Sequence, residues 1–303
     1  MDLLKTPITA LANSVRSKKI SAVEVTKYFL DRIASLNPKL NAFITVNKDA
    51  LKEAEEVDAK IARGEDPGLL AGVPIGIKDS ICTDGLRTTA ASKMLENFVP
   101  PYSATLVHRL REAGGVIIGK TNLDEFAMGS SNETSAFGAV RNPWNPEYVP
   151  GGSSGGSAAA LAAGLVPAAI GTDTGGSIRQ PASFCGVYGV KPTYGRVSRY
   201  GIIAYASSLD QAGPMANSTE DCARLLEVIS GPCRFDSTTA RVEVPRWSAN
   251  LNSDLKGMRI GLPKEFFTKD VEADVEQVTQ AAIEAVKKRG AEIVEVSVPF
   301  VKH

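Results

Sequence analysis

The chain has 303 residues, of which 43% are hydrophobic, and this excludes a disordered protein and a small disulfide-stapled domain. Its 34 basic residues balance its 34 acidic residues, which argues against a nucleic-acid-binding surface of the basic-patch kind. No apolar run approaches the roughly 20 residues of a membrane helix, and the first residues lack the apolar stretch of a signal peptide. We therefore expect a cytoplasmic protein that makes no membrane contact.

Cysteine and histidine are scarce. The four cysteines are widely spaced and form no CxxC pair, so they suit reduced thiols better than a disulfide framework or a zinc site. They are Cys82, Cys185, Cys222 and Cys233. Of the two histidines, His108 falls inside a helix-like segment and His303 is the last residue. We expect no metal site and no histidine base.

The first part of the chain, residues 1–65, predicts helices. Ser21 followed by Glu24 is a capping-box signal, and apolar side chains keep helical spacing after it. This helix is expected to end at Pro38. A second helix is expected over residues 48–63, because Gly64 is a good residue to follow a helix C-terminus.

Residues 66–232 are expected to form the core. Short β-branched runs alternate with helical stretches, which predicts an α/β fold with a mixed, largely parallel sheet covered by helices on both faces. The expected strands are 73–78, 116–119, 168–171 and 187–190. The expected helices are 104–112, 157–165 and 218–229.

The last part predicts a surface loop over residues 233–257 and a strand–helix–strand unit over residues 258–303. Its elements are expected at 258–262, 271–289 and 293–298. A buried parallel strand normally has a helix on each face, and nothing follows the final strand to cover it. We therefore expect a single domain over residues 1–303 whose sheet is cut off at the C-terminus.

The densest signal is a pair of glycine- and serine-rich heptapeptides. Residues 151–157 read GGSSGGS and residues 171–177 read GTDTGGS, and both have the form GxxxGGS. Strongly apolar sequence adjoins each run, which argues against a flexible linker. Neither run has the lysine of a phosphate-binding loop or a GxGxxG fingerprint, and Ser177 lacks a GxSxG elbow. What remains is a serine nucleophile with backbone amides as an oxyanion hole.

A serine nucleophile needs a base within hydrogen-bond reach, and neither histidine is suitably placed. Lysine is the next candidate, provided that burial lowers its pKa. Lys78 stands out because it ends the apolar run GVPIGIK, although a strand-end lysine that reaches solvent is the ordinary alternative. Spacing alone does not choose among Ser153, Ser154 and Ser157 as a bridging group.

These motifs together resemble those of the amidase signature family. Residues 151–181 match its signature GGSSGG followed by GTDTGGSIRQP, and residues 72–79, GVPIGIKD, resemble its lysine strand. The resemblance implies a Ser–cis-Ser–Lys triad. Ser177 is then the nucleophile, Ser153 the bridging serine in a cis peptide after Gly152, and Lys78 the base.

The resemblance also implies roles for the residues that surround Ser177. The oxyanion hole would consist of the backbone amides of Thr174, Gly175, Gly176 and Ser177. Asp173 and Arg179 flank the nucleophile, and we expect them to form an ion pair that fixes the loop.

Two further stretches narrow the resemblance to one branch of the family. Residues 128–135, MGSSNETS, and 191–214, KPTYGRVSRYGIIAYASSLDQAGP, resemble the A subunits of the aspartyl/glutamyl-tRNA amidotransferases. Members of this branch hydrolyse glutamine and work with subunits B and C, where ATP and magnesium serve the conversion of misacylated tRNA. We therefore expect no cofactor in this chain. Members also continue beyond position 303, so one alternative is a catalytically incomplete fragment. The other alternative is a stand-alone amidase acting on another small amide.

Overall fold

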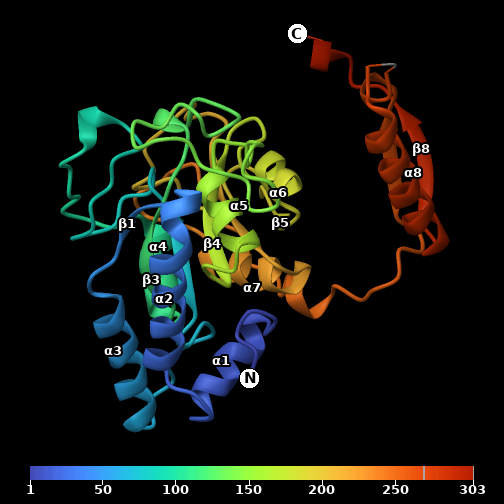
Figure 1. The fold of residues 1–303 in the computed structure, drawn as a ribbon. Coiled ribbons are helices and arrows are strands. Elements are labelled where there is room, and N and C mark those ends of the chain that lie inside the picture. The colour runs from blue at the N-terminus through green and yellow to red at the C-terminus, as the bar shows by residue number, and fades with distance from the viewer. Residues whose placement is uncertain (269, 303) are drawn as a thin grey trace. The chain divides into compact units, whose positions relative to one another are not determined.

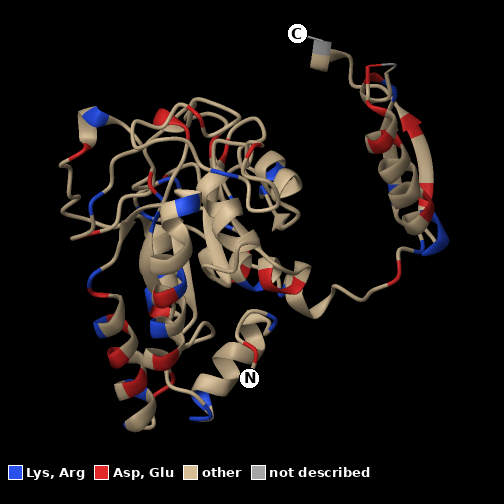
Figure 2. Ribbon diagram, in the orientation of Figure 1, with Lys and Arg blue, Asp and Glu red and all other residues tan. Residues whose placement is uncertain are grey.

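The computed structural model describes residues 1–268 and 270–302 and divides into two compact units, Met1–Ser248 and Ala249–His303. The boundary falls inside the segment that the sequence predicts as a surface loop. The helices α2, Ala22–Leu40, and α3, Ala50–Ala62, carry basic and acidic side chains intermixed along their length (Figure 2), in keeping with the balanced charge.

The first unit is built on a mixed sheet, which confirms the predicted α/β class. Within the described residues this sheet has six strands in the order β1-β3-β2-β4-β6-β5. The central strands β3, β2 and β4 are parallel, and β1 and β6 run against them. The strands are β1 Phe43–Val46, β2 Pro74–Lys78, β3 Val116–Thr121, β4 Ala168–Asp173, β5 Tyr188–Gly189 and β6 Gln211–Ala216.

Helices cover the sheet. Every residue of β2, β3, β4 and β6 is buried, which requires cover on both faces because successive side chains of a strand point in opposite directions. Figure 1 shows α2 and α5 beside the central strands. The helices of this unit are α1 Ile8–Arg16, α2 Ala22–Leu40, α3 Ala50–Ala62, α4 Thr105–Glu112, α5 Gly155–Ala162, α6 Arg179–Cys185 and α7 Thr219–Ile229. None of the described helices is long and apolar enough to cross a membrane.

The start of α2 is as predicted, but its end is not. Glu24 N donates to Ser21 Oγ at 3.0 Å and Ser21 N donates to Glu24 Oε2 at 2.8 Å, which confirms the capping box. The prediction that Pro38 ends the helix was wrong, because α2 continues to Leu40 and stops at Asn41, whose φ is 54°. A proline in the last turn removes only one amide donor, and the buried face of the helix, which includes Leu40, continues past it.

The second unit is a parallel pair of strands with a helix between them, which agrees with the predicted strand–helix–strand order. Strand β7 spans Arg259–Pro263, α8 spans Ala273–Lys288 and β8 spans Glu292–Val296. Both units also contain short 3-10 turns, at Lys93–Leu95, Glu125–Ala127, Trp247–Ala249, Lys264–Phe266 and Pro299–Lys302. His303, which the sequence analysis does not favour as a base, lies outside the described residues.

Candidate active site

Lys78 is fully buried at the end of β2, so the alternative of a lysine that reaches solvent does not hold. Its Nζ donates to Ser153 Oγ at 2.7 Å, to Thr172 Oγ1 at 2.9 Å and to Thr172 O at 3.3 Å. An ammonium group has three protons, so these contacts satisfy the amine when it is protonated; a neutral amine has two protons and a lone pair that can accept from the Ser153 hydroxyl. Thr172 was not predicted from the sequence, although it lies inside the GTDTGG run.

Burial changes the charge state of this lysine. Removal from water lowers the pKa of Lys78 from 10.5 to about 7, although the carboxylates of Asp124, Asp173 and Asp210 act in the opposite direction. A large fraction of the amine is therefore unprotonated near neutral pH. This is the property that a lysine needs in order to accept a proton from a serine hydroxyl.

The structure distinguishes the three candidate bridging serines. Of these three serines, only Ser153 forms a hydrogen bond with Lys78 in the described part of the chain; Ser154 Oγ donates to Thr172 O at 3.1 Å, and Ser157 Oγ lies 2.7 Å from Thr121 Oγ1. The peptide bond between Gly152 and Ser153 is cis, as the resemblance to the family implies.

The glycines after Ser153 allow α5 to approach the sheet closely. A Cβ atom on Gly156 would lie 2.4 Å from Asn122 O and 2.6 Å from Ala42 O, well inside any real contact distance. This absence of a side chain brings the start of α5, and Ser153 before it, onto the strand ends where Lys78 lies.

Ser177 lies next to the bridging serine and faces a small cleft. Its carbonyl oxygen accepts from Ser154 N at 3.0 Å, so the backbones of the two glycine-rich loops are hydrogen-bonded. The cleft has a volume of about 240 Å³ and lies between the two loops. Its lining consists of Ala127, Gly129, Ser130, Gly152, Gly175, Gly176, Ser177, Gln180 and Tyr205. Lys78 and Ser153 are therefore joined as predicted, whereas a hydrogen bond from the Ser177 hydroxyl to Ser153 is not formed among the described residues and stays a prediction.

The predicted oxyanion hole needs one correction. The amide of Gly176 donates to Asp173 Oδ1 at 2.8 Å, so it holds the loop together and is not free to bind an oxyanion in this structure. The amides of Thr174, Gly175 and Ser177 make no hydrogen bond to other described residues. These three remain the candidate donors.

Asp173 and Arg179 form the ion pair that the sequence predicts. Arg179 Nη2 lies 2.9 Å from Asp173 Oδ1 and Arg179 Nε lies 3.0 Å from Asp173 Oδ2, a bidentate geometry. Burial alone would raise the pKa of Asp173, but hydrogen bonds from Arg179 and from the amides of Ile178 and Gly176 outweigh burial and lower it. The ionised carboxylate therefore fixes the loop that carries Ser177.

A second buried lysine adjoins the first and was not predicted. Lys120, on β3, is fully buried, and its Nζ lies 3.5 Å from Asp79 Oδ1 and donates to Thr88 Oγ1 and Ile81 O. Burial lowers the pKa of Lys120 and raises the pKa of Asp79, and each group's charge reduces this effect on the other. The pair fixes the chain that follows Lys78, since Asp79 also accepts from Thr89 N at 2.9 Å.

Replacing Lys120 by methionine should lower the free energy of unfolding by about 3–5 kcal/mol, because the carboxyl of Asp79 is then buried without its cation. Urea unfolding of the 303-residue chain measures this change. A double variant, Lys120→Met with Asp79→Asn, should lose less than Lys120→Met alone. A loss below about 1 kcal/mol for the single variant would contradict a paired, buried ion pair.

His108 has no part in this arrangement. His108 lies on an exposed position of α4, and no hydrogen bond joins it by its side chain to the described residues of the cleft. The four cysteines are free, and burial raises the pKa of the Cys185 and Cys222 thiols to about 12. Among the described residues, serine and lysine therefore remain the candidates for the chemistry of the cleft.

Comparison with known proteins identifies the family. The family model described as Amidase matches residues 24–303. The chain belongs to the amidase family. Among curated relatives, the A subunit of glutamyl-tRNA(Gln) amidotransferase from Bdellovibrio bacteriovorus is 63% identical over 300 residues, which are 99% of this chain and 61% of that protein. The equivalent protein of Carboxydothermus hydrogenoformans is 56% identical over 304 residues, covering 100% of this chain and 63% of that protein.

Solved structures of the amidase family have the same fold. The A subunit of glutamyl-tRNA(Gln) amidotransferase from Thermotoga maritima matches with a TM-score of 0.86 and 43% identity, covering 100% of this chain and 63% of that one. Native peptide amidase from Stenotrophomonas maltophilia matches with a TM-score of 0.88 and 39% identity, covering 97% and 62%. The chain therefore spans about three-fifths of the length of these relatives.

Proposed function

We propose that this chain carries the amide-hydrolysing centre of the A subunit of a tRNA-dependent amidotransferase and releases ammonia from glutamine. The observation that supports this most is the buried Lys78 amine, whose pKa is about 7 and which lies 2.7 Å from Ser153 Oγ. The identity of 63% to the A subunit of a glutamyl-tRNA(Gln) amidotransferase supports glutamine as the amide.

In the proposed reaction the neutral amine of Lys78 accepts the proton of Ser153, which accepts the proton of Ser177. Ser177 Oγ attacks the side-chain amide carbon of glutamine, and the carbonyl oxygen becomes an oxyanion held by the amides of Thr174, Gly175 and Ser177. The C–N bond then breaks, and the proton returns through Ser153 to the departing ammonia. Water hydrolyses the glutamyl ester by the same route in reverse.

The remaining steps belong to partners. We propose that ammonia passes to subunits B and C, where ATP and Mg²⁺ support the conversion of Glu-tRNA(Gln) or Asp-tRNA(Asn) to the amidated form in the cytoplasm. We propose no resident cofactor for this chain. A chain with 34 basic and 34 acidic residues suits this division, because tRNA binding calls for positive charge.

A stand-alone amidase is the second candidate, favoured by the 39% identity to a peptide amidase. The two functions differ in substrate and in dependence on partners. Ammonia release should be measured from glutamine and from a peptide with a C-terminal amide, with and without subunits B and C and Glu-tRNA(Gln). The amidotransferase function predicts turnover of glutamine that increases when the partners and tRNA are added. Turnover of the peptide amide that does not change with partners would contradict it and support the stand-alone amidase.

A further inference from the structure

The segment 199–210 contacts both the residues that follow Lys78 and the cleft that Ser177 lines. Cys82 N donates to Gly201 O and Ile203 N donates to Ser80 O, both at 2.8 Å, so the segment is joined to the residues that directly follow Lys78 and Asp79. The same segment then passes the cleft at Tyr205 and enters β6. A displacement of this segment therefore changes the wall of the cleft.

Asp210 joins the segment 199–210 to Thr174, in the loop that carries Ser177. Its buried carboxylate accepts from Tyr205 N at 2.9 Å, from Ala206 N at 3.1 Å and from the hydroxyl of Thr174. Among the described residues that line the cleft, Tyr205 is the only aromatic side chain, and about half of it is exposed. Tyr205 and Ser177 thus line the same cleft, and the tyrosine side chain is large and partly exposed.

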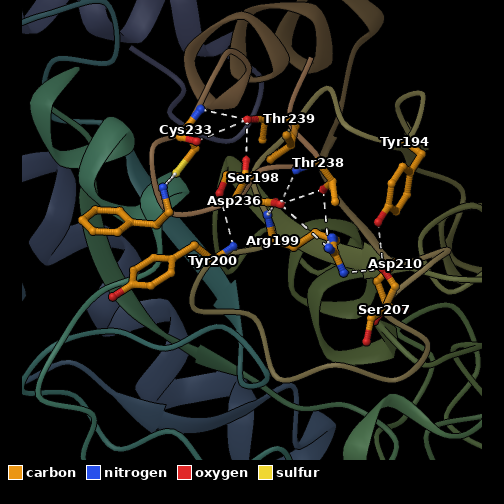
Figure 3. Close-up of polar contacts among 12 residues, drawn as sticks. Tyr194, Ser198, Arg199, Tyr200, Ser207, Asp210, Cys233, Asp236, Thr238 and Thr239 are labelled. Carbon is orange, nitrogen blue, oxygen red and sulfur yellow. Dashed lines mark hydrogen bonds and ion pairs between the residues drawn. The ribbon is translucent and has the colours of Figure 1, made fainter. Parts of the chain in front are cut away.

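Arg199 contacts the turn that follows Tyr205 through a hydrogen bond to Ser207. Figure 3 shows its guanidinium in contact with Asp236 and Thr238 on one side and with Ser207 on the other. It donates to Ser207 O, which also accepts from Tyr194 OH at 2.9 Å. Ser207 lies two residues beyond Tyr205, so this contact fixes the turn that presents the phenol.

The 233–239 loop in turn fixes Arg199. Asp236 Oδ2 accepts from Arg199 N at 2.7 Å, while Asp236 Oδ1 accepts from Thr238 Oγ1 at 2.6 Å and lies 3.8 Å from Arg199 Nη2. Burial would raise the pKa of Asp236, but hydrogen bonds from Thr238 and Arg199 outweigh it and lower the pKa. Asp236 is therefore ionised at neutral pH and holds the arginine in place.

We propose that Tyr205 is a specificity-determining residue of the amide cleft and that Arg199, held by Asp236, is a positioning residue that acts through Ser207 and Tyr205. This inference rests on the proposed function. The phenol narrows the cleft that Ser177 faces, which favours a small amide such as glutamine over a bulkier peptide amide. Arg199 is not among the residues that line the cleft, so we expect it to act through Ser207 and Tyr205 and not by contact with the substrate.

The first test is kinetic and uses the chain assembled with its partner subunits and glutamine. Tyr205→Ala should raise KM about tenfold and change kcat by less than about threefold, because binding geometry is lost while Lys78, Ser153 and Ser177 are unchanged. Arg199→Met, which keeps an aliphatic stem, should raise KM in the same direction. In the double variant, Arg199→Met should raise KM little beyond the value for Tyr205→Ala alone, because both substitutions act through the segment 199–210.

The matched control is Arg196→Met. Arg196 belongs to the same loop but donates to Glu243 O at 3.1 Å and stacks on Trp247, away from the cleft, so its KM should equal that of the wild type. An unchanged KM in Tyr205→Ala, or an Arg199→Met effect that persists undiminished in the double variant, would overturn the inference. Turnover that survives Ser177→Ala would instead overturn the proposed function.

The second test does not depend on activity. In the 303-residue chain, hydrogen exchange at the amides of Tyr205 and Ala206 should be about tenfold faster in Arg199→Met than in Arg196→Met. The reason is that the turn loses the hydrogen bond from Arg199 to Ser207 O. Equal exchange in the two variants would overturn the positioning role of Arg199, whatever the reaction.

Discussion

Replacing Ser177, the proposed nucleophile, by alanine should lower ammonia release from glutamine by about 10³-fold or more, since it removes the oxygen that would form the acyl intermediate. The backbone contacts of the loop do not need this hydroxyl: the ion pair of Asp173 with Arg179 and the bond from Ser154 N to Ser177 O remain. The variant should therefore fold normally. The measurement is steady-state ammonia release by the chain together with the proposed partner subunits B and C.

Ser183→Ala is the matched control for this loss. Ser183 lies on the exposed side of α6, six residues after the nucleophile and outside the cleft lining. Its removal should leave turnover at the wild-type level. Retention of more than about a tenth of the activity in Ser177→Ala would contradict Ser177 as the nucleophile.

Replacing Lys78 by methionine should lower turnover by about 10²–10⁴-fold, the usual contribution of a general base. Methionine keeps the unbranched shape of the buried stem and removes the amine that contacts Ser153. The same substitution at Lys191, a lysine outside the cleft lining that donates to Pro192 O, should leave turnover unchanged.

The Lys78→Met variant should also change how stability depends on pH. The pKa of Lys78 falls from 10.5 in a free side chain to about 7 in the fold, so between these values the unfolded chain holds a proton that the folded chain lacks. The contribution of Lys78 to wild-type stability therefore increases with pH across this window, by up to about 1.4 kcal/mol per pH unit, and is lost as the pH falls toward 7.

Urea unfolding from pH 7 to 10 measures this dependence. The free energy of unfolding of the wild type minus that of Lys78→Met should increase with pH, because other titrating groups cancel in the difference. A difference that stays constant with pH would show that Lys78 keeps an ordinary pKa.

The sequence predicted the site residues that lie in motifs and missed those defined by distant contacts. Lys78 could be singled out because a lysine at the end of an apolar strand is unusual. Lys120 ends a similar run, VIIGK, and the same signal could have identified it. Its partner Asp79 lies 41 positions earlier, so only the parallel pairing of β2 with β3 brings the two together.

Two strands, β6 and β1, were missed, for different reasons. Strand β6 reads QAGPMA, and glycine and proline are depleted in strand interiors. Gly213 is required there by tertiary packing, since a Cβ atom would lie 2.0 Å from Val190 O. Strand β1 has only four residues and lies at an edge of the sheet. For β6 the neighbouring chain, and not the local propensity, determines the strand; the residues of β1, FITV, favour a strand, and its short length hides it.

The hydrogen bond from the Gly176 amide to Asp173 also could not be predicted from the sequence. The run GTDTGGS predicts several free amides, but the carboxylate of Asp173 turns back to accept one of them. Likewise, the aromatic wall at Tyr205 depends on hydrogen bonds to Asp210. Such contacts follow from loop geometry, which residue spacing does not specify.

The central claim is that neutral Lys78 activates Ser177 through Ser153, and the most direct measurement is the rate at which a small fluorophosphonate labels Ser177 as a function of pH. Peptide mass spectrometry identifies the labelled serine. The account predicts that the rate rises about tenfold per pH unit below pH 7 and levels off above it, and that Lys78→Met labels at least about 100-fold more slowly with no such rise. A wild-type rate that does not depend on pH, or labelling of Lys78→Met at the wild-type rate, would contradict it.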